Sequence, residues 1–349
     1  MISAARLATC TVVVSRGQSR NPQKRALEQA IVDAATELDG VDVLVVPHLY
    51  DLPRSSESYE RLGAIEGDMI VASWIYSRAA HWVLDRNGIQ GQVGEVLLSD
   101  TDDEQDESPS NESDSEPSDL DGAEPVDRVT DLYPRPSRNV YCLDLKLSES
   151  ADAFIEEIRR IVDEPAVDDQ LRSLPVVDKT SVGKSILGGE LVQVDEQASR
   201  RWYPVIDFSR CTNCMECVDF CLFGVYGVDG TENILVEQPD NCRKGCPACS
   251  RVCPENAIIF PQHKAPAIAG AQIEGDEGFK IDLSQLFGAP ATSDDPIATA
   301  ARERDEQLLL AGRDAVGIDD SLRKRQADRQ SKPKDSLDCL IDSLDEFDL

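Results

Sequence analysis

The sequence predicts an α/β domain with a parallel sheet, followed by a small cysteine-rich α+β module. The 349-residue length exceeds that of one ordinary domain, strand-like and helix-like segments alternate in the first half, and eight of the eleven cysteines lie between residues 211 and 253. We predict the α/β domain over residues 1–165, a connector over 166–200, the cysteine module over 201–262 and a mostly disordered tail over 270–349.

The first half of the chain alternates strands and helices in the pattern that favours parallel pairing. The apolar, β-branched run 7–14 predicts a strand. Asn21 as N-cap and Pro22 at the first helical position predict the start of a helix, and Gly40 predicts its left-handed end. Further strands are predicted at 41–46, 68–73 and 139–145, and further helices from residue 75 to about 87 and, after a serine cap, around 154–162.

An acidic segment interrupts this alternation. Residues 100–127 contain thirteen Asp or Glu, no Lys or Arg, and many Ser and Pro. Such a composition buries too little apolar surface to offset the entropy of ordering. Because the alternation resumes afterwards, we predict a disordered acidic insert within one domain. In the tail, apolar residues at helical spacing predict a short helix near 336–348 that folds on contact with a partner.

The charge of the chain limits its partners. Lys and Arg total 35 and Asp and Glu total 66, so the net charge is 35 − 66 = −31. Nucleic acid and anionic membranes repel such a chain, whereas a redox partner with a basic surface attracts it. No apolar run reaches the ~18 residues of a membrane-spanning helix, and the first apolar stretch has no signal-peptide pattern. We therefore expect a cytoplasmic protein without membrane insertion.

Two cysteine motifs repeat within the module. The first has the pattern C-x2-C-x2-C-x3-C and the second C-x3-C-x2-C-x3-C-P; they comprise Cys211, Cys214, Cys217 and Cys221, and Cys242, Cys246, Cys249 and Cys253. An apolar, strand-like stretch precedes and follows each motif. Such close spacing is typical of metal ligands in a reducing compartment, whereas structural zinc sites use two cysteine pairs separated by a longer loop. Zinc and disulfides remain the alternatives.

The motifs resemble those of bacterial two-cluster 4Fe-4S ferredoxins over about 60 residues. The resemblance implies a ferredoxin-like fold, two 4Fe-4S clusters and electron transfer. In that family the last cysteine of each motif binds the cluster of the other motif. Carried over to this chain, cluster one takes Cys211, Cys214, Cys217 and Cys253, and cluster two takes Cys242, Cys246, Cys249 and Cys221.

Two positions depart from the ferredoxin pattern. The second motif begins with three intervening residues instead of two, and we expect Gly245 to accommodate the additional residue. Leu222 replaces the proline that usually follows the last cysteine of the motif, so we expect the geometry to differ most at Cys221. A three-iron form of the cluster bound by Cys221 is the alternative to a full cubane.

The loop 15–22 of the α/β domain carries candidate ligand-binding residues. It follows the first strand, at the carboxyl edge where open α/β sheets bind ligands, and Arg16 and Arg20 with the helix amides are candidates for binding an anion there. A surface turn is the alternative. The first 90 residues resemble the cobalt or sirohydrochlorin chelatases, with His81 matching one family histidine and Arg16 standing where another would be. This resemblance implies a flavodoxin-like or Rossmann-like sheet.

These observations together predict an iron–sulfur protein that relays single electrons to or from a partner redox enzyme. One alternative is a redox enzyme or chelatase-like protein whose α/β domain binds substrate or flavin and is served by the clusters. Another is an assembly scaffold whose clusters never change oxidation state. The sequence itself indicates no catalytic constellation.

Overall fold

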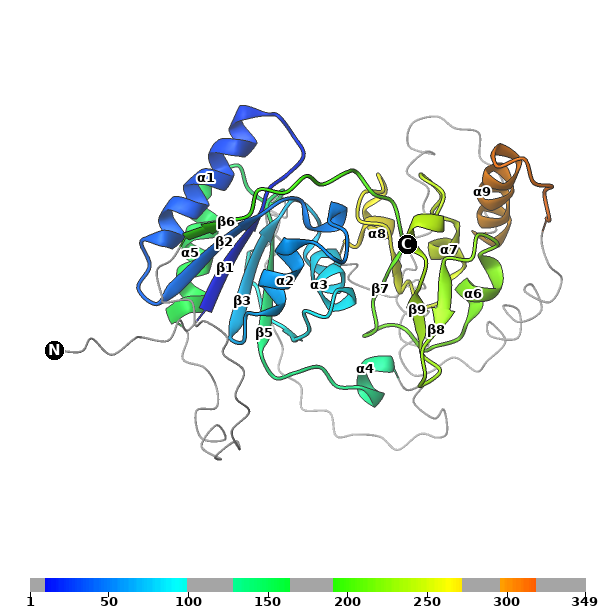
Figure 1. Cartoon of the computed structure of the whole chain (residues 1–349), viewed down its shortest axis with the longest axis horizontal. Helices are drawn as coiled ribbons and strands as arrows, with labels where there is room; N and C mark the ends of the chain where they lie inside the picture. Colours follow the sequence, from blue (N-terminus) through cyan, green and yellow to red (C-terminus); the bar gives the residue numbers. More distant parts are fainter. Residues whose placement is uncertain (1–9, 99–127, 164–190, 272–295, 318–349) are drawn as a thin grey trace, which may run out of the picture.

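The computed structural model describes residues 10–98, 128–163, 191–271 and 296–317. In these residues an α/β domain lies beside the smaller cysteine module (Figure 1). The predicted insert at 100–127, most of the predicted connector and the predicted helix near 336–348 lie outside the described residues.

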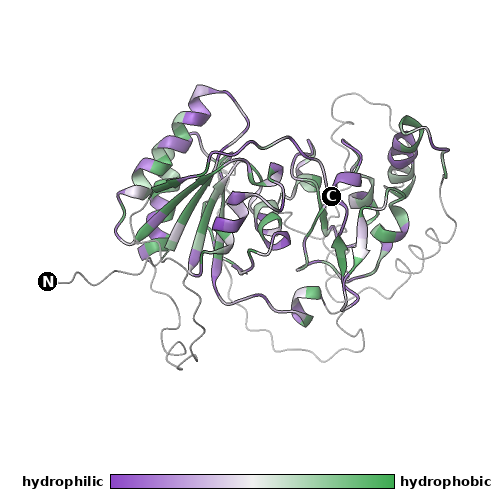
Figure 2. Cartoon of the chain, in the orientation of Figure 1, coloured by the Kyte–Doolittle hydropathy of each residue, from purple (hydrophilic) through white to green (hydrophobic). Residues whose placement is uncertain are grey.

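The α/β domain contains a six-stranded parallel sheet with strand order β4-β5-β3-β1-β2-β6. Its strands are β1 (Cys10–Ser15), β2 (Val41–Val46), β3 (Asp68–Ser73), β4 (Gln92–Val93), β5 (Asn139–Asp144) and β6 (Leu191–Gln193). β1 and β2 are buried at every position because helices cover both faces of the sheet, and Figure 2 shows the apolar strands between more polar helices. Periodicity did not predict β4, which is only two residues long.

Helices flank the sheet on both faces. They are α1 (Pro22–Thr36), the 3-10 helix η1 (Leu49–Asp51), α2 (Glu57–Gly63), α3 (Ser77–Arg86) and α5 (Ala151–Asp163), whereas the short helix α4 (Val129–Leu132) packs against the cysteine module. The Asn21 side chain caps α1 by accepting a hydrogen bond from the Gln23 amide at 2.9 Å. The predicted end of this helix was wrong: α1 stops at Thr36, and Gly40, with φ +78°, forms the turn into β2.

The cysteine module consists of two similar halves. In each half a strand precedes the cysteine loop, and a short helix and a second strand follow it. The first half contains β7 (Val205–Ile206), α6 (Glu216–Phe220) and β8 (Tyr226–Val228). The second half contains β9 (Ile234–Val236), the 3-10 helix η2 (Pro239–Asn241), α7 (Ala248–Val252) and β10 (Ile258–Ile259). β7 pairs antiparallel with β10, and β8 pairs antiparallel with β9. Each pair therefore joins one half to the other. The short helix α8 (Pro266–Ala269) follows.

Within the predicted tail, residues 296–317 are described and contain a helix that the sequence did not predict, α9 (Pro296–Leu310); the remaining residues from 272 onward lie outside the described residues. Ile297 and Ala300 of α9 pack in one buried cluster with Phe220 and Val252 of the module. Arg251 of α7 forms an ion pair with Glu303 at 2.9 Å. The apolar residues of α9 gain a partner surface only from the folded module, which explains why composition alone failed to predict the helix.

The two units share a continuous core. Tyr203, Val205 and Ile259 of the module belong to the same buried cluster as side chains of the sheet and of α3. β6, within the predicted connector, pairs with β2. The residues before the cysteines are thereby fixed to the α/β domain. Among the described residues, no helix is long and apolar enough to cross a membrane.

Candidate metal centre

The structure brings the eight module cysteines together as two quartets, each drawn from both motifs. Burial raises the pKa of Cys217, and charge on Cys253, Cys214 and Cys211 raises it further. In the same way, burial and then charge on Cys221, Cys242 and Cys246 raise the pKa of Cys249. Such charge interactions act between close groups. We name Cys211, Cys214, Cys217 and Cys253 the first quartet, and Cys221, Cys242, Cys246 and Cys249 the second quartet.

Strand pairing explains why the last cysteine of each motif joins the other quartet. β7 leads into the first motif and β10 follows Cys253, so their pairing brings Cys253 to the first motif. β8 follows Cys221 and β9 leads to the second motif, so their pairing brings Cys221 to the second motif.

Residues in the left-handed backbone conformation produce tight turns in the cysteine loops. Asn213 and Met215, which alternate with the cysteines of the first motif, have φ of 55° and 61°. In the second motif Gly245 has φ of +88°. Glycine adopts this conformation without the steric cost that a Cβ would add. Gly245 thus accommodates the additional residue of the second motif, as the sequence predicted.

Cys221 has the same backbone geometry as Cys253 although no proline follows it. Cys221 ends α6 with φ −79° and ψ 107°, and Cys253 ends α7 with φ −64° and ψ 116°. The amide of Cys221 donates to the Cys217 carbonyl at 3.1 Å, and that of Cys253 donates to the Cys249 carbonyl at 3.2 Å. The expected difference at Cys221 is therefore absent from the backbone.

Burial and specific hydrogen bonds define the surroundings of the cysteine sulfur atoms. Burial raises the pKa of Cys246 and of Cys253 to about 11, so both thiols keep their protons near neutral pH until a metal displaces them. The Tyr226 hydroxyl donates to Cys249 Sγ at 3.1 Å, and the Ala257 amide donates to Cys253 Sγ at 3.3 Å.

Tyr226 also lies between the two quartets. Burial raises its pKa well above 10, and charge on Cys249 of the second quartet and on Cys217 of the first raises it further. Tyr226 also packs in one buried cluster with Cys211 and Cys217 of the first quartet and Cys249 of the second, so the two quartets share this cluster.

The second quartet lines a single apolar cavity. Its four cysteines share the lining with Phe220, Phe223, Val225 and Tyr226, and with Arg304 from α9. The Arg304 guanidinium lies over the Phe220 ring, 4.5 Å from its centroid, and its charge lowers the pKa of Cys246. Nearby, Arg313 donates to the Leu222 carbonyl at 2.8 Å. The segment after the module thus covers the second quartet and places a cation beside it.

Other candidate residues lie apart from the quartets. Within the described ranges, every cysteine is free of disulfide bonds, and no three His, Cys, Asp or Glu side chains are arranged to hold a single metal ion. The irons of a four-iron cluster, in contrast, are each bound by a separate thiolate. Cys10 and Cys142 are buried in the sheet, where burial raises the pKa of each to about 12.

The structure separates the residues suggested for the α/β domain. Arg16 lines a pocket at the carboxyl edge of the sheet, but Arg20 and His81 are not among its lining residues. His81 is instead buried in α3, packs edge-on against Trp82 and has a pKa lowered to about 4 by burial. His81 therefore lies away from the pocket that Arg16 lines, because α3 packs against the module.

Comparisons with known proteins match part of the chain. A stretch of 66 residues, 19% of this chain, is 48% identical to a protein of Methanocaldococcus jannaschii described as an uncharacterized ferredoxin. This chain therefore contains a ferredoxin-like region. The match covers 44% of the relative's length, so the chain spans less than half of that protein. No protein-family model and no solved structure matches the chain.

Proposed function

We propose that the protein transfers electrons through two 4Fe-4S clusters, one held by each quartet. The observation that carries the proposal is the crossed arrangement, in which Cys253 joins the first quartet and Cys221 joins the second. A zinc site or a disulfide framework does not require this exchange, whereas the cluster-binding motif of two-cluster ferredoxins does. The ferredoxin-like match supports the same chemistry.

When bound, each cluster would accept and release one electron. The protein's contribution is to hold the clusters and to set their potentials. Burial excludes water, the Tyr226 hydroxyl and the Ala257 amide direct hydrogen bonds at sulfur, and Arg304 adds a positive charge near Cys246. Because Tyr226 packs in one buried cluster with cysteines of both quartets, we propose that electrons pass directly from one cluster to the other.

We propose that a partner with a basic surface docks near the first quartet. The acidic residues 100–127 connect directly to Arg128 and α4. There the Val129 amide donates to the Cys211 carbonyl at 3.0 Å, and Arg128 forms an ion pair with Glu255 at 2.8 Å. The acidic segment therefore rejoins the described chain at Arg128, beside the first quartet, and we propose that its carboxylates attract the basic surface of the partner over about 8 Å at physiological ionic strength.

Anaerobic purification tests the cluster proposal. We expect a brown protein with about eight iron and eight labile sulfide per chain. Cys253→Ala should remove the spectroscopic signal of the first cluster and spare that of the second. Cys142→Ala, which replaces a buried cysteine outside both quartets, is the matched control and should keep both signals. Stoichiometric zinc without visible absorption would contradict the proposal.

A further inference from the structure

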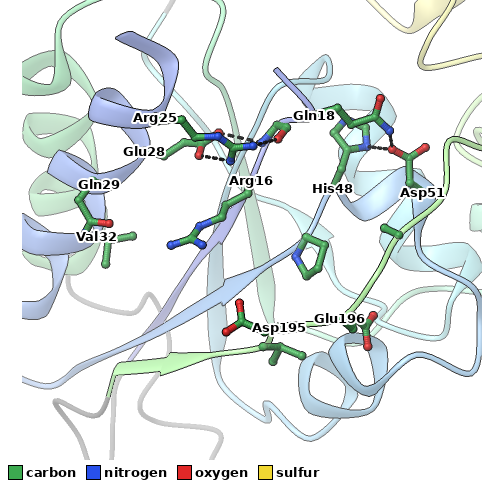
Figure 3. Close-up of a pocket in the computed structure, with 14 residues that line it drawn as sticks. Arg16, Gln18, Arg25, Glu28, Gln29, Val32, His48, Asp51, Asp195 and Glu196 are labelled. Atoms are coloured by element: carbon green, nitrogen blue, oxygen red, sulfur yellow. Dashed lines mark hydrogen bonds and ion pairs between the residues drawn. The ribbon is translucent and has the colours of Figure 1, made fainter. Parts of the chain in front are cut away.

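A pocket of about 520 Å³ opens at the carboxyl edge of the sheet, between the segments that follow β1, β2 and β6 (Figure 3). β1 leads into α1, which packs beside α5 on one face, and β2 leads into η1, which packs against α3 on the other. Where neighbouring parallel strands lead to opposite faces, a crevice forms that commonly binds ligands. The volume is that of a small-molecule site.

One wall of the pocket offers a cation. Arg25 is neutralised there, because its Nη1 lies 2.9 Å from Glu28 Oε2. Arg16 instead donates from Nη2 to the neutral Gln193 side chain at 3.1 Å, and in the described part of the chain it forms no ion pair. Figure 3 shows its guanidinium extending between α1 and the strand that leads to Asp195. Arg16 is therefore suited to bind an anionic group.

The opposite wall offers acceptors. Asp195 accepts a hydrogen bond from Gln193 at 2.8 Å, and Glu196 Oε2 accepts one from the Glu57 amide at 3.0 Å. The second oxygen of Glu196 is buried and has no hydrogen-bond partner among the described residues. A buried carboxylate oxygen requires a donor. Because this oxygen has almost no accessible surface, the acceptor that a ligand of the pocket can reach on this wall is the exposed carboxylate of Asp195.

The buried carboxylate of Asp51 ties this pocket to the cysteine module. It is fully buried and accepts hydrogen bonds from Gln18 of the pocket, from the Arg201 amide at 3.1 Å and from Gln262 Nε2 at 2.8 Å. His48 Nδ1, also in the pocket, lies 3.1 Å from its Oδ2. Two segments of the module thus hold the pocket side chains in place.

An aromatic pair leads from the pocket to the second quartet. Tyr50, between His48 and Asp51, stacks on Tyr203 with ring centroids 4.3 Å apart. Cys242 of the second quartet packs against the buried core cluster that contains both tyrosines. The two tyrosines thus connect the segment between His48 and Asp51, which line the pocket, to the second quartet.

We propose that this pocket binds a redox-active organic anion that accepts electrons from the second cluster. Arg16 holds its carboxylate or phosphate, and Asp195 accepts hydrogen bonds from its O–H or N–H groups. A quinone or flavin ring takes up two electrons and two protons. Each reduced cluster gives one electron, a reducing partner protein restores both clusters, and the protons come from solvent past His48. The electron step rests on the proposed function, whereas binding does not.

Two pairs of probes test binding and show whether the anionic group of the ligand is a phosphate on a flavin or a carboxylate on a quinone. FMN is compared with riboflavin, which lacks the phosphate, and anthraquinone-2-carboxylate is compared with its neutral hydroxymethyl analogue. We expect one charged probe to bind the full-length protein at least tenfold more tightly than its neutral counterpart. Arg16→Gln should abolish this difference, and Arg61→Gln, which changes an exposed arginine of α2, should preserve it. The binding inference is overturned if neither charged probe binds or if Arg16→Gln binds equally well.

Electron exchange has a separate readout. Protein with prereduced clusters is freed of reductant and mixed with the probe that binds, and cluster absorption is followed by stopped flow. We expect the reoxidation rate to saturate with probe concentration in the wild type and to rise linearly in Arg16→Gln. A linear dependence in both overturns the electron step. Iron content of the same samples distinguishes this result from failure of the proposed function, which would show as protein without clusters.

Discussion

Replacing Arg78 by Met should strongly destabilise the contact between the α/β domain and the cysteine module. Arg78 Nε lies 2.5 Å from Asp207 Oδ2, and the two side chains are only 7% and 2% exposed. Arg78 Nη2 also donates to the Asn256 carbonyl at 2.6 Å. The variant would leave the Asp207 carboxylate buried with only Ser209 as a close donor and Arg210 at 3.7 Å.

Breaking a buried ion pair by removing one partner costs about 3–5 kcal/mol. For a folded unit of 150–250 residues, each kcal/mol shifts the melting temperature by about 2–4 °C. We therefore expect Arg78→Met to melt about 6–20 °C lower, measured by circular dichroism on anaerobic protein with intact clusters. The control is Arg61→Met, whose 2.7 Å pair with Glu57 is 43% and 57% exposed and contributes about 0.3–0.5 kcal/mol.

The double variant Arg78→Met with Asp207→Asn separates charge from packing. It removes the unpaired carboxylate and should recover part of the lost stability. A single variant that melts within 2 °C of the Arg61→Met control would show that the buried pair does not hold the two units together. A double variant as unstable as the single one would show that packing around Arg78, and not the unpaired charge, determines the loss.

Four further changes test other parts of the structure. Burial lowers the pKa of His81 to about 4, so the unfolded chain binds a proton at higher pH than the folded chain, and the free energy of unfolding is highest above pH 6.5. Between pH 7.5 and 5 the free energy of unfolding of His81→Phe, measured in urea, should therefore fall by about 2 kcal/mol less than that of the wild type. Tyr226→Phe removes the donor to Cys249 and should lower the potential of the second cluster by tens of millivolts in a redox titration, whereas an effect on the first cluster alone would contradict the assignment. Arg304→Gln removes a cation near the same cluster and should lower that potential too, with an unchanged value counting against the role of α9. Gly245→Ala places a Cβ at φ +88° and should cost about 1–2 kcal/mol, checked by the melting temperature of the loaded protein.

The sequence alone predicted the features that depend on local spacing. The buried strands 41–46 and 68–73 follow from short runs rich in apolar residues, and the start of α1 follows from a cap at Asn21. Cysteine spacing singled out all eight thiols, and the family resemblance assigned them to crossed quartets. Metal-binding motifs are readable in this way because a loop that surrounds a cluster must place its thiolates at short, fixed intervals.

Only the tertiary structure decided which distant segments meet. α9 is unremarkable as a sequence and gains its buried face from α7, so composition suggested disorder where a helix covers the second quartet. Asp51, Tyr50 and Tyr203 carry no motif, yet folding places them between the pocket and Cys242. His81 fitted a family motif in sequence but lies away from the pocket of Arg16, because the helix after β3 packs on the face of the sheet that contacts the module. The local spacing of residue types determines which secondary structure a segment can form and which group it can bind. Which distant segments pack against it depends on the burial of apolar surface over the whole chain.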